Sequence, residues 1–467
     1  MTEPGRSSVL ELPAELIHEI LTYLSPGEIS NFGLSCKQAR GHLDRGNKSL
    51  WRRVFLNVFE NPQRAWQGLT PTARANNKQR EEEWDWYGEL ERRLEARRII
   101  LDDDVTIELK RDRFEDVMHA LLDILETGRH NHKYFNDYCP HPYDRNLEFL
   151  EDIFQVPKAS FFLNDFTIDR DSALPFEDHS GGPMTRSRTS KRRVPECASQ
   201  IHIYHGITES ERTQERPGAK SSARELVYDW SKFSPDCDYG PFHPDGSVNW
   251  HVVEAVSSLM AQAVHMQADN FQVCPFEKPA TKYPCDPETD WAGISYERDV
   301  WMGTYAFLDY ADLALFNFER ARGVSISLGE FDEASGLLSR LCLHRDDRIK
   351  DDQALKTRLP VCEDLPTIYF SGSSQSQGLM HTHGAGIRGC VSLVPGGKEV
   401  RWRFIIRYSG LDQWQLEGVQ PGGIRTGPIF GIWSGCDHEE NGPVGPFSYY
   451  TEEEEEEEEE QQGGGNP

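Results

Sequence analysis

The apolar positions near the N-terminus follow the period of an α-helix. Spacings of four, one, three, one and three residues separate Leu12, Leu16, Ile17, Ile20, Leu21 and Leu24, which places these side chains along one helical stripe. Pro13 suits a first helical turn, where its missing N–H costs nothing, and Ser25-Pro26-Gly27 ends the helix. Two further short helices, around residues 28–34 and after Cys36, complete a predicted unit at residues 8–60.

So small a helical unit buries little surface of its own. Its apolar positions exceed what one internal seam accommodates, and a surplus of this kind is typical of an interaction site. We therefore expect the unit at residues 8–60 to dock on another protein.

Residues 78–126 continue with helical patterns. Trp84, Tyr87, Leu90 and Leu94 lie on one face of a charged segment. A further helix is indicated by Phe114, Val117, Met118, Leu121, Leu122 and Leu125. We interpret residues 78–126 as a helical linker.

Residues 171–224 are rich in Ser, Gly, Pro and charge, which is typical of loops, and we interpret residues 127–224 as a loop-rich insertion with short elements. Within them, IHIYHGI at residues 201–207 is predicted as a short strand. The basic cluster Arg186, Arg188, Lys191, Arg192 and Arg193 matches a nuclear import signal in composition, but we favour a solvated loop.

The pattern becomes β-like after a predicted helix at about residues 250–266. In VRWRFIIRY, one face carries Val400, Trp402, Phe404, Ile406 and Tyr408, and the other carries Arg401, Arg403 and Arg407, as in a half-buried strand. A hairpin joins this strand to residues 387–394. Further strands are predicted at residues 300–308, 324–328, 337–343, 367–372, 413–420 and 428–433. Many short strands separated by Gly and Pro favour a barrel or a sandwich-like fold for residues 225–450.

Composition narrows the class of protein. The 467 residues carry a net charge of −27, which argues against a nucleic-acid partner. The start of the chain lacks a secretory pattern and no apolar run reaches membrane-spanning length, so we expect no membrane partner. Ten cysteines without a CxxC pair indicate reduced thiols and a cytoplasmic or nuclear location, or both. The tail at residues 451–467, with its run Glu452–Glu460, is predicted to be disordered.

Three sequence patterns partly resemble cofactor-binding or metal-binding motifs, but none of them fits such a motif well. Gly384–Gly389 fits GxGxxG, but a strand and a turn follow in place of a helix. His130, His132, Cys139 and His141 match no common zinc spacing. His381 and His383 would share a strand face and meet His438 in a metal trio, which we disfavour. We predict no catalytic residues, no metal and no cofactor.

The segment LPAELIHEILTYLSPGEISNFGLSCKQAR, continuing to Trp51, resembles the F-box. This resemblance implies a helical motif that docks on the Skp adaptor of a cullin–RING ubiquitin ligase. The positions that match core or adaptor-facing positions of the motif are Leu12, Pro13, Leu16, Ile17, Ile20, Leu21, Leu24, Ile29, Leu34, Cys36 and Trp51. The sequence does not separate those two roles. Ala39 departs from the pattern, because relatives often place a bulky residue there.

A second resemblance covers the β-rich region. RDVWMGTY (298–305), VRWRF (400–404), WQLEGVQPGG and GIWSGCDHEENGPVGPF, together with VYDW, YGPF and VNW upstream, are similar to the C-terminal region of a group of F-box proteins. The likeness extends more distantly to those whose β-barrel domain captures the tails of cyclins and other substrates. The aromatic residues Trp301, Trp402 and Trp433 are expected in the barrel core.

These observations predict an α+β protein with an N-terminal three-helix F-box and helical linker, followed by a β-rich barrel or sandwich-like domain with a few helices. The expected function is a non-catalytic substrate-recognition subunit of an SCF-type (Skp–cullin–F-box) ubiquitin ligase. Its partners would be the Skp adaptor, the cullin and RING subunits reached through it, and a protein substrate. Contacts to an acidic or carboxylate-bearing peptide are hypothesised for Arg401, Arg403, Arg407 and Arg425.

Two alternatives belong to other classes of protein. One is a small-ligand-binding β-barrel whose F-box couples turnover to the ligand, which requires an open barrel interior. The other is an enzyme built around His381, His383 and His438, which requires a bound metal.

Overall fold

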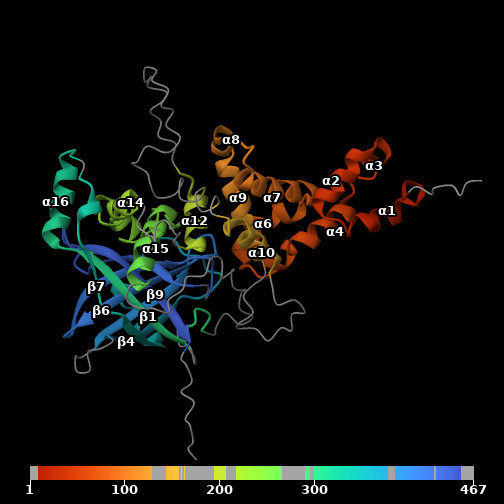
Figure 1. Ribbon diagram of the computed structural model, residues 1–467. Helices are drawn as coiled ribbons and strands as arrows, with labels where there is room; N and C mark the ends of the chain where they lie inside the picture. Colours follow the sequence, from red (N-terminus) through yellow and green to blue (C-terminus); the bar gives the residue numbers. More distant parts are fainter. Residues whose placement is uncertain are drawn as a thin grey trace, which may run out of the picture. The chain divides into compact units, whose positions relative to one another are not determined.

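The computed structural model describes residues 9–128, 144–156, 159, 162, 194–206, 217–265, 290–294, 299–324, 326–376, 384–424 and 427–453. The chain divides into two compact units (Figure 1). The helical unit comprises residues 1–222 with 273–283 and 396–398, and the barrel unit comprises residues 223–272, 284–395 and 399–467. Each unit is described by itself.

The helical unit begins with four helices in the predicted F-box segment. After the turn η1 (Val9–Glu11) these are α1 (Ala14–Leu21), α2 (Pro26–Ser35), α3 (Lys37–Gly41) and α4 (Lys48–Val58). The helices that follow are α5 (Pro62–Gln67), α6 (Pro71–Glu82), α7 (Trp86–Leu101), α8 (Ile107–Asp112), α9 (Phe114–Glu126), α10 (Arg145–Phe154) and α12 (Glu196–His205). Side-chain caps mark several starts: Ser25 accepts from the backbone N–H of Glu28, whose carboxylate in turn accepts from the Ser25 N–H.

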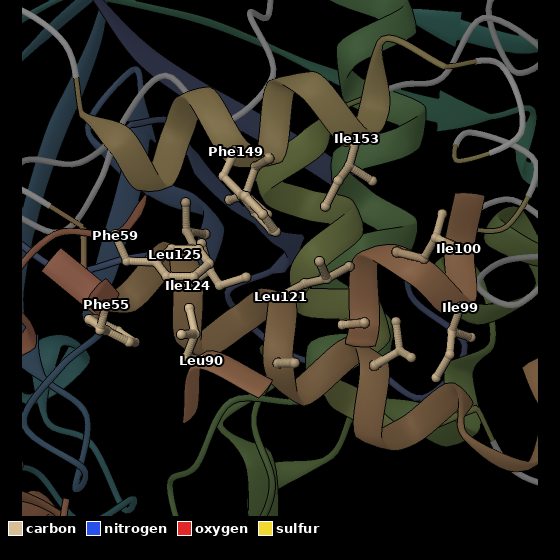
Figure 2. Packing of buried hydrophobic residues seen from close by; sticks show 14 of the residues in the cluster. Phe55, Phe59, Leu90, Ile99, Ile100, Leu121, Ile124, Leu125, Phe149 and Ile153 are labelled. Carbon is tan, nitrogen blue, oxygen red and sulfur yellow. The ribbon is translucent and has the colours of Figure 1, made fainter. Parts of the chain in front are cut away.

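One hydrophobic core joins the F-box segment to the later helices. Figure 2 shows Phe55 of α4 and Phe59, which directly follows α4, near Leu90 of α7, Ile124 of α9 and Phe149 of α10. The rings of Phe59 and Phe149 have centroids 4.8 Å apart and meet edge to face. The F-box segment therefore rests on a larger helical body.

The predicted strand at residues 201–207 is wrong, because residues 196–205 form α12. α12 packs against α9, and Ala198 and Ile201 are fully buried in the common core. The short run IHIYHGI between loop-like segments favoured a strand. In the structure His202 and His205 are buried along with the apolar residues, and tertiary packing overrode local β propensity.

Eight antiparallel strands of the barrel unit form a closed barrel. They are β1 (Asp299–Leu308), β3 (Ser339–Arg345), β4 (Ile368–Ser376), β5 (Ala385–Leu393), β6 (Val400–Tyr408), β7 (Leu411–Gln420), β8 (Ile429–Gly435) and β9 (Val444–Glu453). Neighbours pair in order of the chain, and β1 pairs with β9 from Asp299↔Glu453 to Tyr305↔Phe447. That last pairing closes the barrel, so the predicted α+β class is confirmed and the barrel replaces the sandwich.

Shorter elements flank the barrel. β2 (Glu333–Ser335) adds to the end of β1. The helices of the region are α14 (Pro217–Val227), α15 (Trp250–His265) and α16 (Tyr310–Ala321), and the 3₁₀ turns are η3 (Trp230–Lys232), η4 (Pro235–Cys237), η5 (Leu328–Glu330), η6 (Asp347–Ile349) and η7 (Gln353–Leu355). α15 confirms the helix predicted at about residues 250–266, and it packs against β1, β8 and β9.

Aromatic rings and glycines share the barrel interior. The Trp402 ring lies 5.1 Å from Trp301, 5.9 Å from Phe370 and 5.7 Å from Phe404, measured between centroids. Gly389 pairs with both Phe370 and Phe404, and its missing side chain leaves the space that the Phe370 ring fills. Because large and absent side chains alternate across strands, the interior is filled with protein at this level.

The structure corrects three further predictions about this unit. Among the described residues of 324–328 there is no strand, and η5 begins at Leu328. β6 is not half-buried, since residues 400–405 are all buried. β9 extends through Glu453, so the barrel includes the first residues of the predicted acidic tail, whereas residues 454–467 lie outside the described part of the chain. No helix in the described residues is long and apolar enough to cross a membrane.

Gly389→Ala is expected to destabilise the barrel. A Cβ at this position would lie 2.2 Å from the Arg403 carbonyl oxygen and 2.3 Å from Phe370 Cζ, and the carbonyl belongs to a paired strand that cannot yield cheaply. Overpacking of this kind costs about 1–3 kcal/mol, measurable as a lower urea midpoint for the full chain. Gly396→Ala is the control, since its Cβ would meet nothing within 4 Å. Equal midpoints for the two variants would contradict the filled interior.

Candidate functional site

Helix α1 exposes an apolar face. Leu16 and Ile20 are four residues apart in α1, so they lie on the same side of the helix, and Leu12 precedes the helix. The exposed fractions of Leu12, Leu16 and Ile20 are 40%, 51% and 42%, respectively. We call Leu12, Leu16 and Ile20 the α1 face. Leu34, near the end of α2, is 79% exposed and adds a further uncovered aliphatic side chain.

The opposite side of α1 belongs to the core. Ile17 and Leu21 are each 1% exposed and pack in the same cluster as Ile29, Leu50 and Trp51. Trp51 donates its indole N–H to the Asp44 carbonyl at 2.9 Å. The eleven positions of the resemblance thus separate by role. Ile17, Leu21, Ile29 and Trp51 are buried, Leu24 is partly buried, and Leu12, Pro13, Leu16, Ile20, Leu34 and Cys36 are exposed.

Polar contacts from α4 and the residue before it hold α1 in this orientation. Asn47 Nδ2 lies 3.3 Å from His18 Nδ1. Further along α4, Arg53 pairs with Glu19, and Asn57 donates to the carbonyl of Thr22. These contacts lie beside the buried residues Ile17 and Leu21, so they leave the α1 face uncovered.

Ala39 does not leave a gap in the third helix. Its side chain is fully buried, and its backbone N–H donates to Cys36 Sγ at 3.4 Å. Cys36 therefore caps α3. The small Ala39 side chain is enclosed by protein, where relatives often place a bulky residue.

The barrel arginines occupy different environments from one another. Arg401 and Arg403 are 4% and 5% exposed. Arg401 Nη2 lies 2.8 Å from Asp238 Oδ2 and 2.7 Å from Glu417 Oε2. Arg403 pairs with Glu417 and lies 3.2 Å from Asp238 Oδ2. Two guanidinium groups and two carboxylates thus form one internal network.

Electrostatics and covering segments explain why these charges are buried on the outer wall of the barrel. Burial opposes the charge of Arg401, but Glu417 and Asp238 outweigh it and raise the pKa of the guanidinium. Arg403 also donates to the carbonyls of Ala354 and Lys356 at 3.3 and 2.6 Å. The segment containing residues 354–356 covers the outer face of β6. At Arg401 and Arg403, the predicted solvent face of that strand is therefore an internal contact.

A pocket of about 240 Å³ lies beside this network. Tyr369, Cys390 and Arg403, which line it, pair across β4, β5 and β6. They alternate with Phe370, Gly389 and Phe404 of the interior, so the pocket is on the outer wall. It does not supply the open barrel interior that the small-ligand alternative requires.

Arg407 differs from Arg401 and Arg403 because its side chain is 48% exposed. Its Nε donates to Asp412 Oδ1 at 2.8 Å, and Arg388 holds both oxygens of the same carboxylate at 2.7 Å. Hydrogen bonds from Arg388, opposed by burial and supplemented by Arg407, lower the pKa of Asp412 to about 2. Arg425 lies outside the described residues.

The patterns set aside in the sequence do not form a described catalytic or metal site. Residues 385–389 of the Gly384–Gly389 motif lie within β5, so the helix that a dinucleotide site requires does not follow it. His130, His132, Cys139, His141, His381 and His383 lie outside the described residues. His438 stacks on Tyr239, with ring centroids 3.5 Å apart. Within the described part of the chain, no group of three or more His, Cys, Asp or Glu side chains is arranged to hold a metal.

Comparison with known proteins identifies one segment. Residues 9–57 match the family model described as F-box-like, which covers α1–α4 and the α1 face. Neither the curated proteins nor the solved structures include a match to this chain.

Truncation on the two sides of α1 should have unequal effects on stability. Ile17→Ala removes a fully packed side chain and is expected to cost about 2–5 kcal/mol of unfolding free energy. Ile20→Ala removes a half-exposed one and is expected to stay within about 0.5 kcal/mol of the parent protein. Chemical unfolding of each full-length variant, followed by circular dichroism of the helices, measures both. A reversed order would contradict the assigned orientation of α1.

Acid should weaken the contribution that Asp412 makes to the free energy of unfolding. Its pKa of about 2 lies below the value of about 3.9 expected in the unfolded chain. Its ionised form therefore stabilises the fold above pH 4, and this contribution is lost as the pH falls toward 2. Asp412→Asn should lower the melting temperature at pH 6, with the difference from the parent shrinking toward pH 2. A constant difference between those pH values would exclude the linkage.

Proposed function

We propose that this chain is the substrate-recognition subunit of an SCF-type ubiquitin ligase. An F-box-like domain suggests the adaptor role of F-box proteins, which are generally non-catalytic. The α1 face is the observation that carries the proposal, because it offers Leu12, Leu16 and Ile20 to a partner while the buried side of the same helix fixes their position. The proposed partner is the Skp adaptor, with the cullin and RING subunits bound through it.

The α1 face is suited to anchoring a protein partner. Fully burying an aliphatic side chain contributes about 1.5–3 kcal/mol, and these three are already half covered, so each would contribute roughly half of that. Interface anchors of this kind are effective when their rotamers are supported in advance. The core contacts of Ile17 and Leu21 supply that support for the helix.

The barrel unit is proposed to hold the protein substrate. Its action would be proximity, since holding a substrate lysine near a charged conjugating enzyme raises the effective concentration without an acid or base from this chain. The filled interior favours recognition on the outer surface and loops over insertion deep into the barrel. Cytoplasmic and/or nuclear location remains part of this proposal.

Contact between the barrel arginines and an acidic substrate peptide stays a prediction, and the arginines differ in how available they are for it. Arg401 and Arg403 have most of their donor groups committed to internal partners. Arg407 keeps half of its side chain exposed, and is the better placed of the three to meet a carboxylate. Co-purification with proteasome and cullin activity blocked would enrich substrates, and their loss from an Arg407→Ala variant would assign the contact.

The adaptor contact is tested by the double variant Leu16→Asp/Ile20→Asp. Two carboxylates on the α1 face would have to be desolvated in the complex, so co-purification of the Skp adaptor should fall at least about tenfold, the equivalent of 1.4 kcal/mol. Binding constants from surface-based kinetics would give the same comparison quantitatively.

Leu411→Asp is the matched control, because Leu411 is 75% exposed but lies on the barrel. It should leave adaptor binding unchanged. Melting temperatures of all variants must match the parent, so that loss of binding is not loss of fold. Retention of the adaptor by the folded Leu16→Asp/Ile20→Asp protein would refute the docking proposal.

A further inference from the structure

The pocket on the outer wall of the barrel has a floor made by three strands, and we call it the outer-wall pocket. Tyr369, Cys390 and Arg403 form one row of the floor across β4, β5 and β6, and Ser392 and Arg401 form the next row across β5 and β6. Its volume of about 240 Å³ is below the roughly 300–1,000 Å³ of a typical small-molecule site. The outer-wall pocket therefore suits a small chemical group better than a nucleotide or another large cofactor.

A covering segment, residues 355–361, completes the outer-wall pocket, and four of its residues line it. Near the start of the segment, the Lys356 carbonyl accepts a hydrogen bond from Arg403 at 2.6 Å. Directly after its end, the Cys362 N–H donates to the carbonyl of Leu393 at 3.0 Å. Because strand and covering segment are both held by hydrogen bonds, the pocket is pre-formed, as ligand sites usually are.

Three hydroxyl groups that line the outer-wall pocket have no hydrogen-bond partner in the described part of the chain. They belong to Thr367, Tyr369 and Ser392. Ser392 is only 7% exposed, and buried hydroxyl groups are normally hydrogen-bonded. Burial raises the pKa of Tyr369, so its hydroxyl stays protonated and can donate. These three groups point to a ligand that carries acceptor oxygens.

The charges at the outer-wall pocket favour a ligand with one negative charge. Arg401 and Arg403 line the pocket, but Asp238 and Glu417 balance their charges. Lys356 also lines it, is exposed, and has no ion pair among the described residues. None of the described lining residues is acidic. A single negative charge would therefore compensate Lys356, whereas a cation would meet three positive side chains.

The remaining lining chemistry narrows the class of ligand. Burial raises the pKa of the Cys390 thiol to about 11, so no thiolate opposes an anion at neutral pH. An apolar ligand would leave the hydroxyls of Tyr369 and Ser392 unpaired, and a phosphate dianion would exceed the charge of Lys356. A carboxylate carries one negative charge and about four acceptor positions, which matches three hydroxyls and one ammonium.

We propose that the outer-wall pocket binds the carboxylate of an aspartate or glutamate side chain of the protein substrate. This inference rests on the proposed role of the barrel unit and adds the chemistry that it recognises. Lys356 supplies the positive charge, the three hydroxyls donate hydrogen bonds, and Leu355 and Val361 offer apolar surface to the short stem of the acidic side chain.

The test follows the melting temperature of the full chain with N-acetylglutamate N-methylamide, which presents one glutamate side chain between two uncharged peptide groups. A ligand that binds only the folded chain stabilises it by mass action, by about 3 °C for each tenfold increase above its dissociation constant. The matched compound, N-acetylglutamine N-methylamide at the same ionic strength, should leave the melting temperature unchanged.

Two variants assign the binding to the outer-wall pocket. Lys356→Met removes the uncompensated charge, and Ser392→Ala removes a hydroxyl without adding volume, so each should reduce the affinity about tenfold, as loss of a charge-assisted or buried hydrogen bond does. Lys350→Met is the control, because Lys350 is an exposed lysine of the same unit that does not line the pocket. Each variant is compared with its own melting temperature without ligand, so its basal stability does not enter the result.

The outcomes separate this inference from the proposed function. No rise for the parent chain, or equal rises with the glutamate and glutamine compounds, would overturn the carboxylate assignment. A rise that persists in both pocket variants would place the binding elsewhere and overturn it too. A rise with sodium acetate but none with the blocked glutamate would assign the pocket to free organic acids and exclude the substrate side chain. None of these measurements involves the Skp adaptor, so adaptor docking stands or fails independently of them.

Discussion

The division of α1 into a buried and an uncovered side is the constraint on which the N-terminal domain depends. Ile17 and Leu21 must enter the core for the helix to exist at all, because eight residues in isolation would not remain helical in water. Once they do, the helical period dictates where Leu16 and Ile20 point. The stability of α1 and the exposure of Leu16 and Ile20 therefore depend on the same contacts. The buried side of α1 packs in one cluster with Leu50, Trp51 and Phe55. The other side of the same helix exposes aliphatic side chains.

In the barrel unit, too, packing of the interior determines which side chains face outward. Its interior packs Trp301, Trp402 and Phe404 against one another, and Gly389 makes room for Phe370 between paired strands. This leaves the outer wall as the place where charges are arranged. There, Arg401 and Arg403 form ion pairs with Asp238 and Glu417. These pairs attach the segment that contains Asp238 to β6 and β7. The net stability that such a buried network adds is small, because the cost of desolvating the charges offsets much of their attraction.

Sequence reasoning succeeded where one pattern had one physical cause. The Leu16, Ile17, Ile20 and Leu21 spacing predicted a helix, and the Trp402–Phe404 alternation predicted a strand. It could not assign Ile17 to the core and Ile20 to the surface, because both are aliphatic and the choice depends on where α4 lies. It also placed Arg401 and Arg403 at the surface, since a charged residue is rarely buried unless paired, and the pairing carboxylate of Asp238 lies far away in the chain. Residues 201–205 were predicted as a strand because nothing in the local pattern reveals that α12 packs against α9. What escaped prediction was in each case a long-range contact.

Closure of the barrel through β1 and β9 has a consequence for how the protein is made. The two strands that seal the cylinder are separated by nearly the whole barrel sequence, and the second ends at Glu453. During synthesis, the helices at the N-terminus emerge early and have partners close in the chain. The barrel must instead wait, with an unpaired edge on β1, until β9 has been synthesised. A newly made chain would thus have α1 folded, with Leu16 and Ile20 exposed, before its barrel is closed.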